Sequence, residues 1–362
     1  MRDLSGARPL ARSSVELDGI VADYKRDLSL VPECVTEPGG PTVLEVNWGT
    51  LGEACEWLTA HRDPLRGVLD VHGAVVLTGL PVRSSQDFAK VRDCLITERV
   101  PYREQATPRS SFGDDVYSST DFPAARSIRP HNENSYTLTF PALLIFCCLT
   151  SPDEGGATPV TDVRRVLRDI PAELSGKFRS RGWALARNYA HELGLPWTTA
   201  FGTEDKVKVD EYCAANLIAN EWRGGDTLRT TQRRSAVITH PRTGDEVWFN
   251  HLVFWSEWTL LPMIRQVLVD EYGADGLPFA TFFGDGQPVS EQDIKLIDEA
   301  YREATVRRPW TPGDVMIVDN LLTAHGRESF TGDRKVLVAM GEPTDLTACR
   351  PTVPPLAGFA DR

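Results

Sequence analysis

The sequence predicts a mainly β protein with helical insertions (α+β), built around a β-sandwich or barrel. Short apolar runs lie between glycine and proline breakers at 73–81, 142–148, 315–318 and 334–340, as is typical of buried strands. A hairpin pattern covers 236–249, where β-forming residues flank a turn with proline and glycine. Because short strands with glycine turns dominate, this class is favoured over a parallel βαβ sheet.

The remaining elements are predicted from hydrophobic spacing. A short strand is expected at 115–120, ahead of the polar segment that precedes the 142–148 run. Helices are expected at 84–98 with Ser85 as its cap, at 162–182 with a break at Pro171, at 204–216 and at 255–272.

The 362 residues, of which 41% are hydrophobic, are enough for one large domain with a substantial core. Residues 1–42 are expected to form an N-terminal extension and connector, rich in proline and glycine near its end. Residues 43–345 then form a single domain with a helical insertion around 162–230, and residues 346–362 a C-terminal tail.

Composition limits the partners and the location. The formal net charge of −12 argues against nucleic acid as a partner, because phosphate neutralisation needs a basic surface. The chain shows no apolar signal core at its start and no stretch long enough to span a membrane. Seven scattered cysteines suggest no disulfide framework. These features predict a cytoplasmic protein without membrane contact.

Three residues carry the main chemical signal. His131 and Glu133 stand two positions apart, and on an extended strand their side chains converge while Asn132 and Asn134 point away. His325 follows far along the chain, just after the apolar run at 315–318. Two imidazoles and one carboxylate can fill one face of an octahedral Fe(II) site and leave the other face open. The triplet therefore predicts a mononuclear non-haem iron oxygenase.

Two further residues extend this hypothesis. Thr158 follows a glycine turn, and Arg334 opens the last apolar strand. Fe(II) with this ligand set carries +1, and a chelating dianionic 2-oxo acid makes the assembly −1. A guanidinium that binds the distal carboxylate brings the buried charge to zero, and a threonine hydroxyl can add a hydrogen bond. Arg327 and Lys335 are the alternative partners of that carboxylate.

At these motifs the sequence resembles the Fe(II)/2-oxoglutarate-dependent dioxygenases of the taurine dioxygenase type (TauD/TfdA) and their clavaminate synthase-like relatives. The similarity covers approximately residues 70–342, and its motifs are Pro130 to Tyr136, Gly155 to Asp162, Gly244 to Asn250, Asp319 to Arg327 and Phe330 to Arg334. The resemblance implies a double-stranded β-helix (jelly roll), with His131, Glu133 and His325 as iron ligands. It also implies that Thr158 and Arg334 bind 2-oxoglutarate, and that O₂ is the second co-substrate.

The departures from the family pattern bear on the substrate. Many members carry a second arginine four residues after the co-substrate arginine, but this chain has Val338 there, which makes taurine an unfavoured substrate. Glu133 disfavours halogenation, because related halogenases lack a carboxylate at that position. The closest resemblance is to hydroxylases of amino acids in secondary-metabolite pathways, acting on free or carrier-tethered substrates. The alternatives are desaturation or cyclisation, a cupin-type metalloenzyme that does not use 2-oxoglutarate, and a non-catalytic metal-binding or interaction protein.

Other polar residues have weaker signals. Asn132, Asn250 and His251 are candidate substrate contacts, with packing as the alternative role of His251. His240 lies in a turn and is expected to be solvated. The pairs Arg164-Arg165 and Arg233-Arg234 are expected to form solvated faces. The alternative is that they dock an acidic carrier protein.

Overall fold

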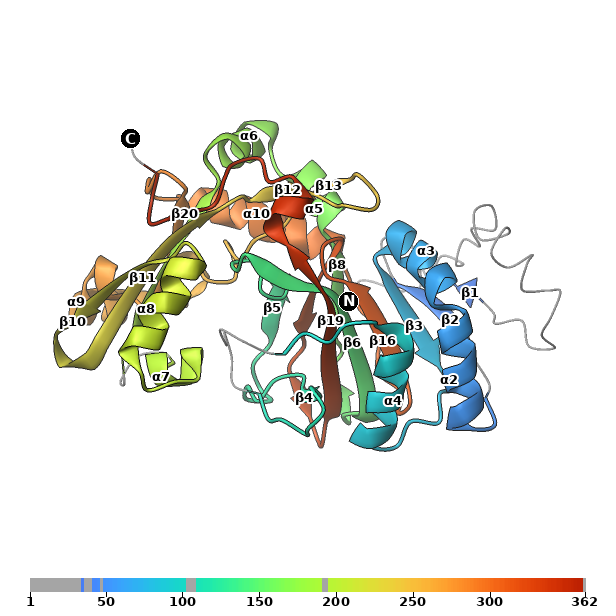
Figure 1. Cartoon of the computed structure of the whole chain (residues 1–362). Helices are drawn as coiled ribbons and strands as arrows, with labels where there is room; N and C mark the ends of the chain where they lie inside the picture. The colour runs from blue at the N-terminus through green and yellow to red at the C-terminus, as the bar shows by residue number, and fades with distance from the viewer. Residues whose placement is uncertain (1–33, 36–40, 46–47, 102–108, 191–194, 361–362) are drawn as a thin grey trace, which may run out of the picture.

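A computed structural model describes residues 34–35, 41–45, 48–101, 109–190 and 195–360 of the chain (Figure 1). Within these residues the fold is mixed α/β, with several antiparallel sheets and helices packed at their margins. Most of the predicted N-terminal extension lies outside the described residues. None of the helices among the described residues is long and apolar enough to cross a membrane.

The largest sheet has seven strands and contains the four predicted apolar runs. In spatial order they are β1 (Cys34–Val35), β2 (Thr42–Glu45), β3 (Ala74–Thr78), β16 (Val315–Asp319), β6 (Thr139–Thr150), β19 (Lys335–Asp345) and β4 (Tyr117–Ser118). Neighbouring strands are antiparallel except β2 and β3, which are parallel. The strand predicted at 115–120 is the two-residue β4. Strands β1 and β2 show that the chain joins this sheet before the boundary expected at residue 43.

This sheet is buried on both faces, which explains why its strands read as uninterrupted apolar runs. On β3, Val75 and Leu77 pack with the helices α2 (Leu51–Ala60), α3 (Arg62–His72) and α4 (Ser85–Leu95). The alternate residues Ala74 and Val76 pack on the opposite face. Figure 1 shows the three helices on one side of the sheet. The cap of α4 is Ser84 and not Ser85, because the Ser84 hydroxyl accepts the Asp87 amide at 3.1 Å.

A four-stranded sheet covers the opposite face. Its order is β15 (Thr305–Val306), β8 (Val160–Asp162), β17 (Thr323–Arg327) and β5 (Ile128–His131), and all neighbours are antiparallel. Val160 of β8 packs with Phe146 and Val338 of the larger sheet in one buried cluster. The short strands β7 (Glu154–Gly155) and β18 (Phe330–Thr331) pair beside it.

A third sheet extends away from these two, at the left of Figure 1. Its strands are β10 (Ala219–Arg223), β11 (Thr227–Arg234), β9 (Trp183–Tyr189) and β14 (Phe279–Phe283), with β20 (Leu356–Ala357) paired to β11. Strands β14 and β20 lie outside the predicted insertion at 162–230, so this sheet contains later parts of the chain as well. Through β20 the C-terminal tail pairs with β11.

The later helices are α5 (Val163–Asp169), α6 (Ala172–Arg181), α7 (Trp197–Phe201), α8 (Lys206–Ala215), α9 (Pro262–Tyr272) and α10 (Glu291–Ala304). Each predicted helical segment contains a helix, but α2, α3 and two of the later helices, α7 and α10, were not predicted. Short 3-10 turns cover Gly224–Asp226, Glu257–Thr259, Ala274–Gly276 and Leu346–Cys349. The helix predicted at 162–182 breaks at Pro171 as expected. The prediction of one helix over 255–272 is wrong at its start, because a 3-10 turn precedes α9.

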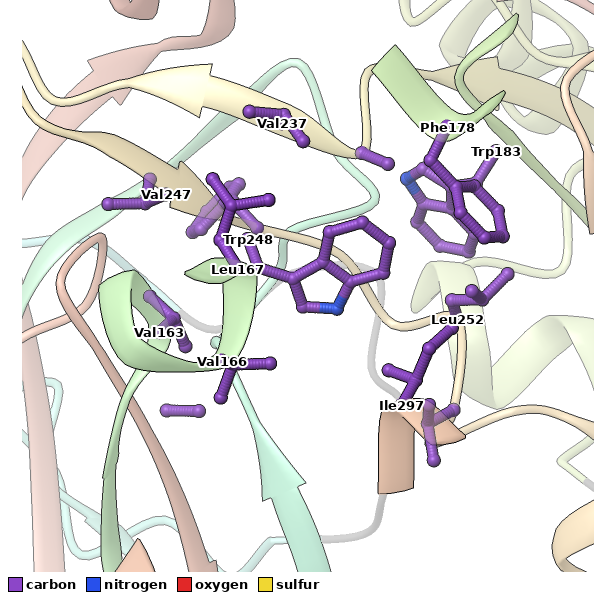
Figure 2. Close-up of a cluster of buried hydrophobic side chains, with 14 of the residues drawn as sticks. Val163, Val166, Leu167, Phe178, Trp183, Val237, Val247, Trp248, Leu252 and Ile297 are labelled. Carbon is purple, nitrogen blue, oxygen red and sulfur yellow. The ribbon is translucent and has the colours of Figure 1, made fainter. Parts of the chain in front are cut away.

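The predicted hairpin is present as β12 (Val237–Thr239) and β13 (Glu246–Trp248). Figure 2 shows Trp248 of this hairpin among buried side chains of α5, α6, β9 and α10. The Trp248 and Phe178 rings meet edge to face at a centroid distance of 5.3 Å. This cluster fixes the hairpin against the helices.

Two predicted surface groups are buried instead. The side chain of His240 is 2% exposed, and its Nε2 lies 3.2 Å from Asp319 Oδ2. Arg234 is 1% exposed and donates to several backbone carbonyls, including Tyr136 at 2.9 Å and Asn216 at 2.6 Å. The prediction of a solvated face is therefore wrong for Arg234. The other predicted pair, Arg164 and Arg165, is half-buried, and Arg164 Nη2 lies 3.0 Å from Asp162 Oδ2.

Candidate active site

Strand pairing brings the two distant histidines together. In the register of β5 and β17, His131 stands directly opposite His325, and their ring centroids are 4.5 Å apart. Gly326 makes this close approach feasible, because a Cβ there would lie 2.6 Å from the Ile128 carbonyl oxygen. The pairing of the two strands, and not a loop, therefore sets the distance between the imidazoles.

Glu133 does not lie on the strand as predicted but in the turn that follows β5. Asn320 holds this turn: its Oδ1 accepts the Glu133 amide at 2.7 Å, and its Nδ2 donates to the Glu133 carbonyl at 2.9 Å. The same Nδ2 reaches the Pro141 carbonyl at 2.8 Å, and the Asn320 side chain is fully buried. Asn132 adds a hydrogen bond to the Asn320 carbonyl at 2.7 Å. The first two candidate ligands are thus tied to the segment that leads to the third.

The side chains of His131, Glu133 and His325 converge as predicted. Each offers one ligand atom, and these atoms lie within 4.8 Å of one another, with Glu133 Oε2 3.7 Å from His325 Nε2. His131 Nδ1 lies 2.9 Å from the Arg129 carbonyl, so Nδ1 carries the proton and Nε2 keeps its lone pair. Burial lowers the pKa of His131 and lowers that of His325 well below its ordinary value. Both imidazoles are therefore favoured in the neutral form that binds metals.

Arg109 is a member of the site that the sequence did not indicate. Its Nη2 donates to Glu133 Oε2 at 2.7 Å, and both side chains are 4% exposed. A cation bound by the three ligand residues shares this carboxylate with the guanidinium. The electrostatic balance of the site therefore depends on a residue outside the predicted triplet.

Thr158 and Arg334 also meet as predicted. Arg334 Nη2 lies 3.2 Å from Thr158 Oγ1, while its Nε donates to the Gly156 carbonyl at 2.8 Å and its Nη1 to Ser119 Oγ at 3.0 Å. Gly156 has a φ of +67°, and a Cβ there would lie 3.1 Å from Arg334 Cδ, so glycine is needed for this packing. Burial lowers the pKa of Arg334 to about 10, which an anion beside it would reverse.

The two alternative cations are placed differently. Arg327 is buried and donates to the carbonyls of Phe122, Pro123 and Arg126 at 2.8, 2.6 and 2.6 Å, so it holds that loop. Lys335 is exposed, with Nζ 5.1 Å from the centre of the Phe112 ring. Of the three cations, Arg334 is the one whose guanidinium contacts Thr158.

One of the three candidate substrate contacts faces the cavity. His251 lies in its wall, 5.4 Å from His131 between ring centroids, and its Nδ1 bonds to Ser135 Oγ at 2.6 Å. The Asn250 amide bonds to the Ala236 carbonyl and the Leu252 amide. As stated above, the Asn132 amide bonds to Asn320. The side chains of these two asparagines therefore serve the local fold.

All five predicted iron and co-substrate residues line one cavity. Its wall also contains Arg109, Ser119, Thr120, Ile128, Phe146, His251, Phe254, Gly326 and Arg327. A second hollow of about 600 Å³ shares Ser119, Thr120, Arg327 and Arg334 with it. Arg334 therefore stands between the two hollows. The arrangement can hold a divalent cation at one end and an anion at the other, and Phe146 and Phe254 form the aromatic part of the wall.

Comparison with known proteins agrees with this site. The family model of the taurine catabolism dioxygenase TauD, TfdA family matches residues 37–340. The chain is 35% identical over 305 residues to the dapdiamide synthesis protein DdaC of Enterobacter agglomerans, covering 84% of this chain and 92% of that protein. It is 26% identical over 287 residues to a clavaminate synthase-like protein of Arabidopsis thaliana, covering 76% and 83%.

Among solved structures, a taurine dioxygenase from Burkholderia xenovorans aligns with a TM-score of 0.49 and 16% identity, covering 88% of this chain and 93% of that chain. The family match extends over most of the chain and includes every residue of the cavity described above. The chain therefore belongs to the TauD, TfdA family and is an Fe(II)- and 2-oxoglutarate-dependent oxygenase that uses O₂.

Proposed function

We propose that the chain hydroxylates an unactivated C–H bond of an amino acid-like substrate in a secondary-metabolite pathway. In this proposal His131, Glu133 and His325 bind Fe(II), and Thr158 and Arg334 bind the distal carboxylate of 2-oxoglutarate. The observation that carries it is the pairing of β5 with β17, which gathers the two imidazoles and the carboxylate at one end of a cavity. Thr158 and Arg334 line the same cavity.

The three candidate ligands fit a metal ion. Bonds of about 2.1 Å at right angles separate adjacent ligand atoms by roughly 3 Å; here Glu133 Oε2 and His325 Nε2 are 3.7 Å apart, and all three ligand atoms lie within 4.8 Å of one another. A small inward movement of the side chains is therefore enough to close the site. Two neutral nitrogen donors and one carboxylate are the ligand set of non-haem Fe(II) oxygenases, with open positions on the opposite face.

The co-substrate end fits a carboxylate. Arg334 is a half-buried guanidinium whose planar fork suits a carboxylate, and the adjacent Thr158 hydroxyl can donate one more hydrogen bond. When bound, iron and 2-oxoglutarate supply the oxidation of the C–H bond with O₂. The protein's own residues then orient the two reactants, balance their charge and exclude water. Phe146 and Phe254 provide the apolar part of the wall.

The substrate class rests on similarity and on the chemistry of the pocket. The relative of 35% identity takes part in dapdiamide synthesis, which supports a biosynthetic role. Arg109, Ser119 and Thr120 add polar donors to the wall, as a substrate with amino and carboxyl groups requires. Many family members carry a second arginine at the position of Val338, but here the position holds an uncharged side chain buried between the two sheets. It offers no cation to bind a sulfonate, so taurine remains unfavoured. Desaturation or cyclisation of the same substrate is the alternative outcome.

A panel of free and carrier-loaded amino acids tests the proposal. Succinate release above the substrate-free background identifies the substrate, and the product mass identifies the reaction: +16 for hydroxylation, −2 for desaturation or cyclisation. The His325→Ala variant is the matched control and should abolish release. If no member of the panel raises succinate release while the wild-type chain binds Fe(II) and 2-oxoglutarate, the proposed substrate class is wrong.

We further propose that the two facing sheets form a double-stranded β-helix and that residues 43–345 act as one catalytic unit in the cytoplasm. The packing of Val160 against Phe146 and Val338 supports the first part, because it closes the two sheets over one buried cluster. No feature of the two arginine pairs supports docking of a carrier protein, since Arg234 is buried and Arg164 is bound to carboxylates.

A further inference from the structure

The Thr158 hydroxyl receives two hydrogen bonds from groups that can only donate. Trp310 Nε1 lies 3.0 Å from Thr158 Oγ1, and Arg334 Nη2 lies 3.2 Å from the same oxygen. Thr158 is 6% exposed, so water has little access to it. Trp310 reaches this oxygen from the segment that leads into β16, far from Thr158 in the sequence.

This arrangement determines where the hydroxyl proton points. A threonine oxygen has two lone pairs and one proton, whereas an indole N–H and a guanidinium offer no acceptor. With both lone pairs occupied, Thr158 must donate its proton to a third group. Within the part of the chain that the structure describes, no acceptor takes this proton. Thr158 lines the cavity, so an acceptor on a bound ligand is the partner that completes the set.

Neighbouring contacts hold the two donors in place. The Trp310 indole packs against the buried cluster between the two large sheets. Arg334 is held by the Gly156 carbonyl at 2.8 Å and by Ser119 Oγ at 3.0 Å. The orientation of the Thr158 proton is therefore set before any ligand binds, which reduces the entropy lost on binding.

We propose that Trp310 is a positioning residue that makes Thr158 an obligate hydrogen-bond donor and so selects an ionised carboxylate at the distal end of the 2-oxo acid. This inference rests on the proposed binding of 2-oxoglutarate by Thr158 and Arg334. Because Thr158 and Arg334 both offer donors to the ligand, a 2-oxo acid that ends in a methyl group gives the Thr158 proton no acceptor. Such an unpaired buried donor penalises its binding.

The test compares Trp310→Phe, Thr158→Val and the double variant. Dissociation constants for 2-oxoglutarate and for 2-oxopentanoate, which lacks the distal carboxylate, are measured anaerobically with Fe(II) by visible absorption, alongside kcat and KM. Trp258→Phe is the matched control, because its indole donates to the Val289 carbonyl at 3.1 Å away from the cavity. Melting temperatures of the metal-free variants report on folding.

We expect Trp310→Phe to weaken 2-oxoglutarate about 3- to 10-fold, and Thr158→Val about 10- to 100-fold, with kcat nearly unchanged. The double variant should bind 2-oxoglutarate no more weakly than Thr158→Val, because without the hydroxyl the indole has nothing to orient. Affinity for 2-oxopentanoate should stay unchanged or rise in the variants, because they remove a donor that this ligand leaves without an acceptor.

Additive effects of the two substitutions, or equal weakening of both 2-oxo acids, would overturn the inference. So would wild-type affinity for 2-oxoglutarate in Trp310→Phe. A wild-type chain that fails to bind 2-oxoglutarate at all would instead contradict the proposed function, so the two failures are distinguishable.

Discussion

Asn320 is the residue whose removal most directly tests how the site is assembled. Its side chain accepts the Glu133 amide and donates to the carbonyls of Glu133 and Pro141, all at 2.7 to 2.9 Å in a fully buried position. Substitution by alanine leaves these three backbone groups without their partner. A buried amide that loses its bond costs roughly 2 kcal/mol and each carbonyl roughly 1 kcal/mol, so the sum is about 4 kcal/mol.

We therefore expect Asn320→Ala to lower the free energy of unfolding by about 4 kcal/mol, a large part of the 5 to 15 kcal/mol typical of proteins. Denaturant titration of the metal-free chain measures it. Because the turn that carries Glu133 loses its anchor, Fe(II) should also bind about 10- to 100-fold more weakly to the folded variant, as found when residues that orient metal ligands are removed.

Asn220→Ala is the matched control. The Asn220 amide bonds to Asp210 Oδ1 at 2.6 Å near the surface, so its loss should cost less than about 1 kcal/mol and leave Fe(II) binding unchanged. If Asn320→Ala is within about 1 kcal/mol of the wild-type chain, or binds Fe(II) with wild-type affinity, the reasoning about the assembly of the site is refuted.

Two further substitutions separate the metal end of the cavity from the co-substrate end. Arg334→Ala should weaken the binding of 2-oxoglutarate about 100-fold, because it removes a charged hydrogen-bonding partner. It should change the affinity for Fe(II) by less than about threefold. Equal weakening of both affinities in anaerobic titrations would contradict the role of Arg334. Arg109→Gln should tighten Fe(II) binding about threefold or more, because the guanidinium competes for Glu133 Oε2 at 2.7 Å; weaker binding would show that Arg109 orients the carboxylate instead.

The strands and the core of the site were predictable from local patterns. The runs that became β3, β6, β16 and β19 carry apolar residues on both faces of the strand because both faces are covered, and such runs stand out in the sequence. His131, Glu133, His325, Thr158 and Arg334 were recognisable because the chemistry of the site restricts their residue types and their order. The structure brings these five together in one cavity.

The environments of single polar residues were not predictable, because distant segments supply them. His240 looks like a solvated turn residue, but it packs against Asp319, 79 positions away. Its Nδ1 accepts the amides of Arg242 and Thr243, so Nε2 carries the proton toward that carboxylate. Arg234 is charged and yet buried, because its guanidinium donates hydrogen bonds to backbone carbonyls of segments distant in the sequence, including those of Tyr136 and Asn216.

The residues missed at the site share one cause. Arg109 is 24 positions from Glu133, and Trp310 is 152 positions from Thr158. Neither lies at a spacing that any periodicity or motif marks, and their roles arise from tertiary packing alone. Glu133 was expected on a strand, but the turn after β5 holds it, because Asn320 supplies the hydrogen bonds that a neighbouring strand would otherwise make.

The most direct test of the central claim is an anaerobic titration of the metal-free chain, first with Fe(II) and then with 2-oxoglutarate, followed by visible absorption. The account predicts one Fe(II) and one 2-oxoglutarate per chain with a weak charge-transfer band, which His325→Ala and Glu133→Ala lose. A wild-type chain without the band, or variants that retain it at full intensity, would contradict the assignment of these residues.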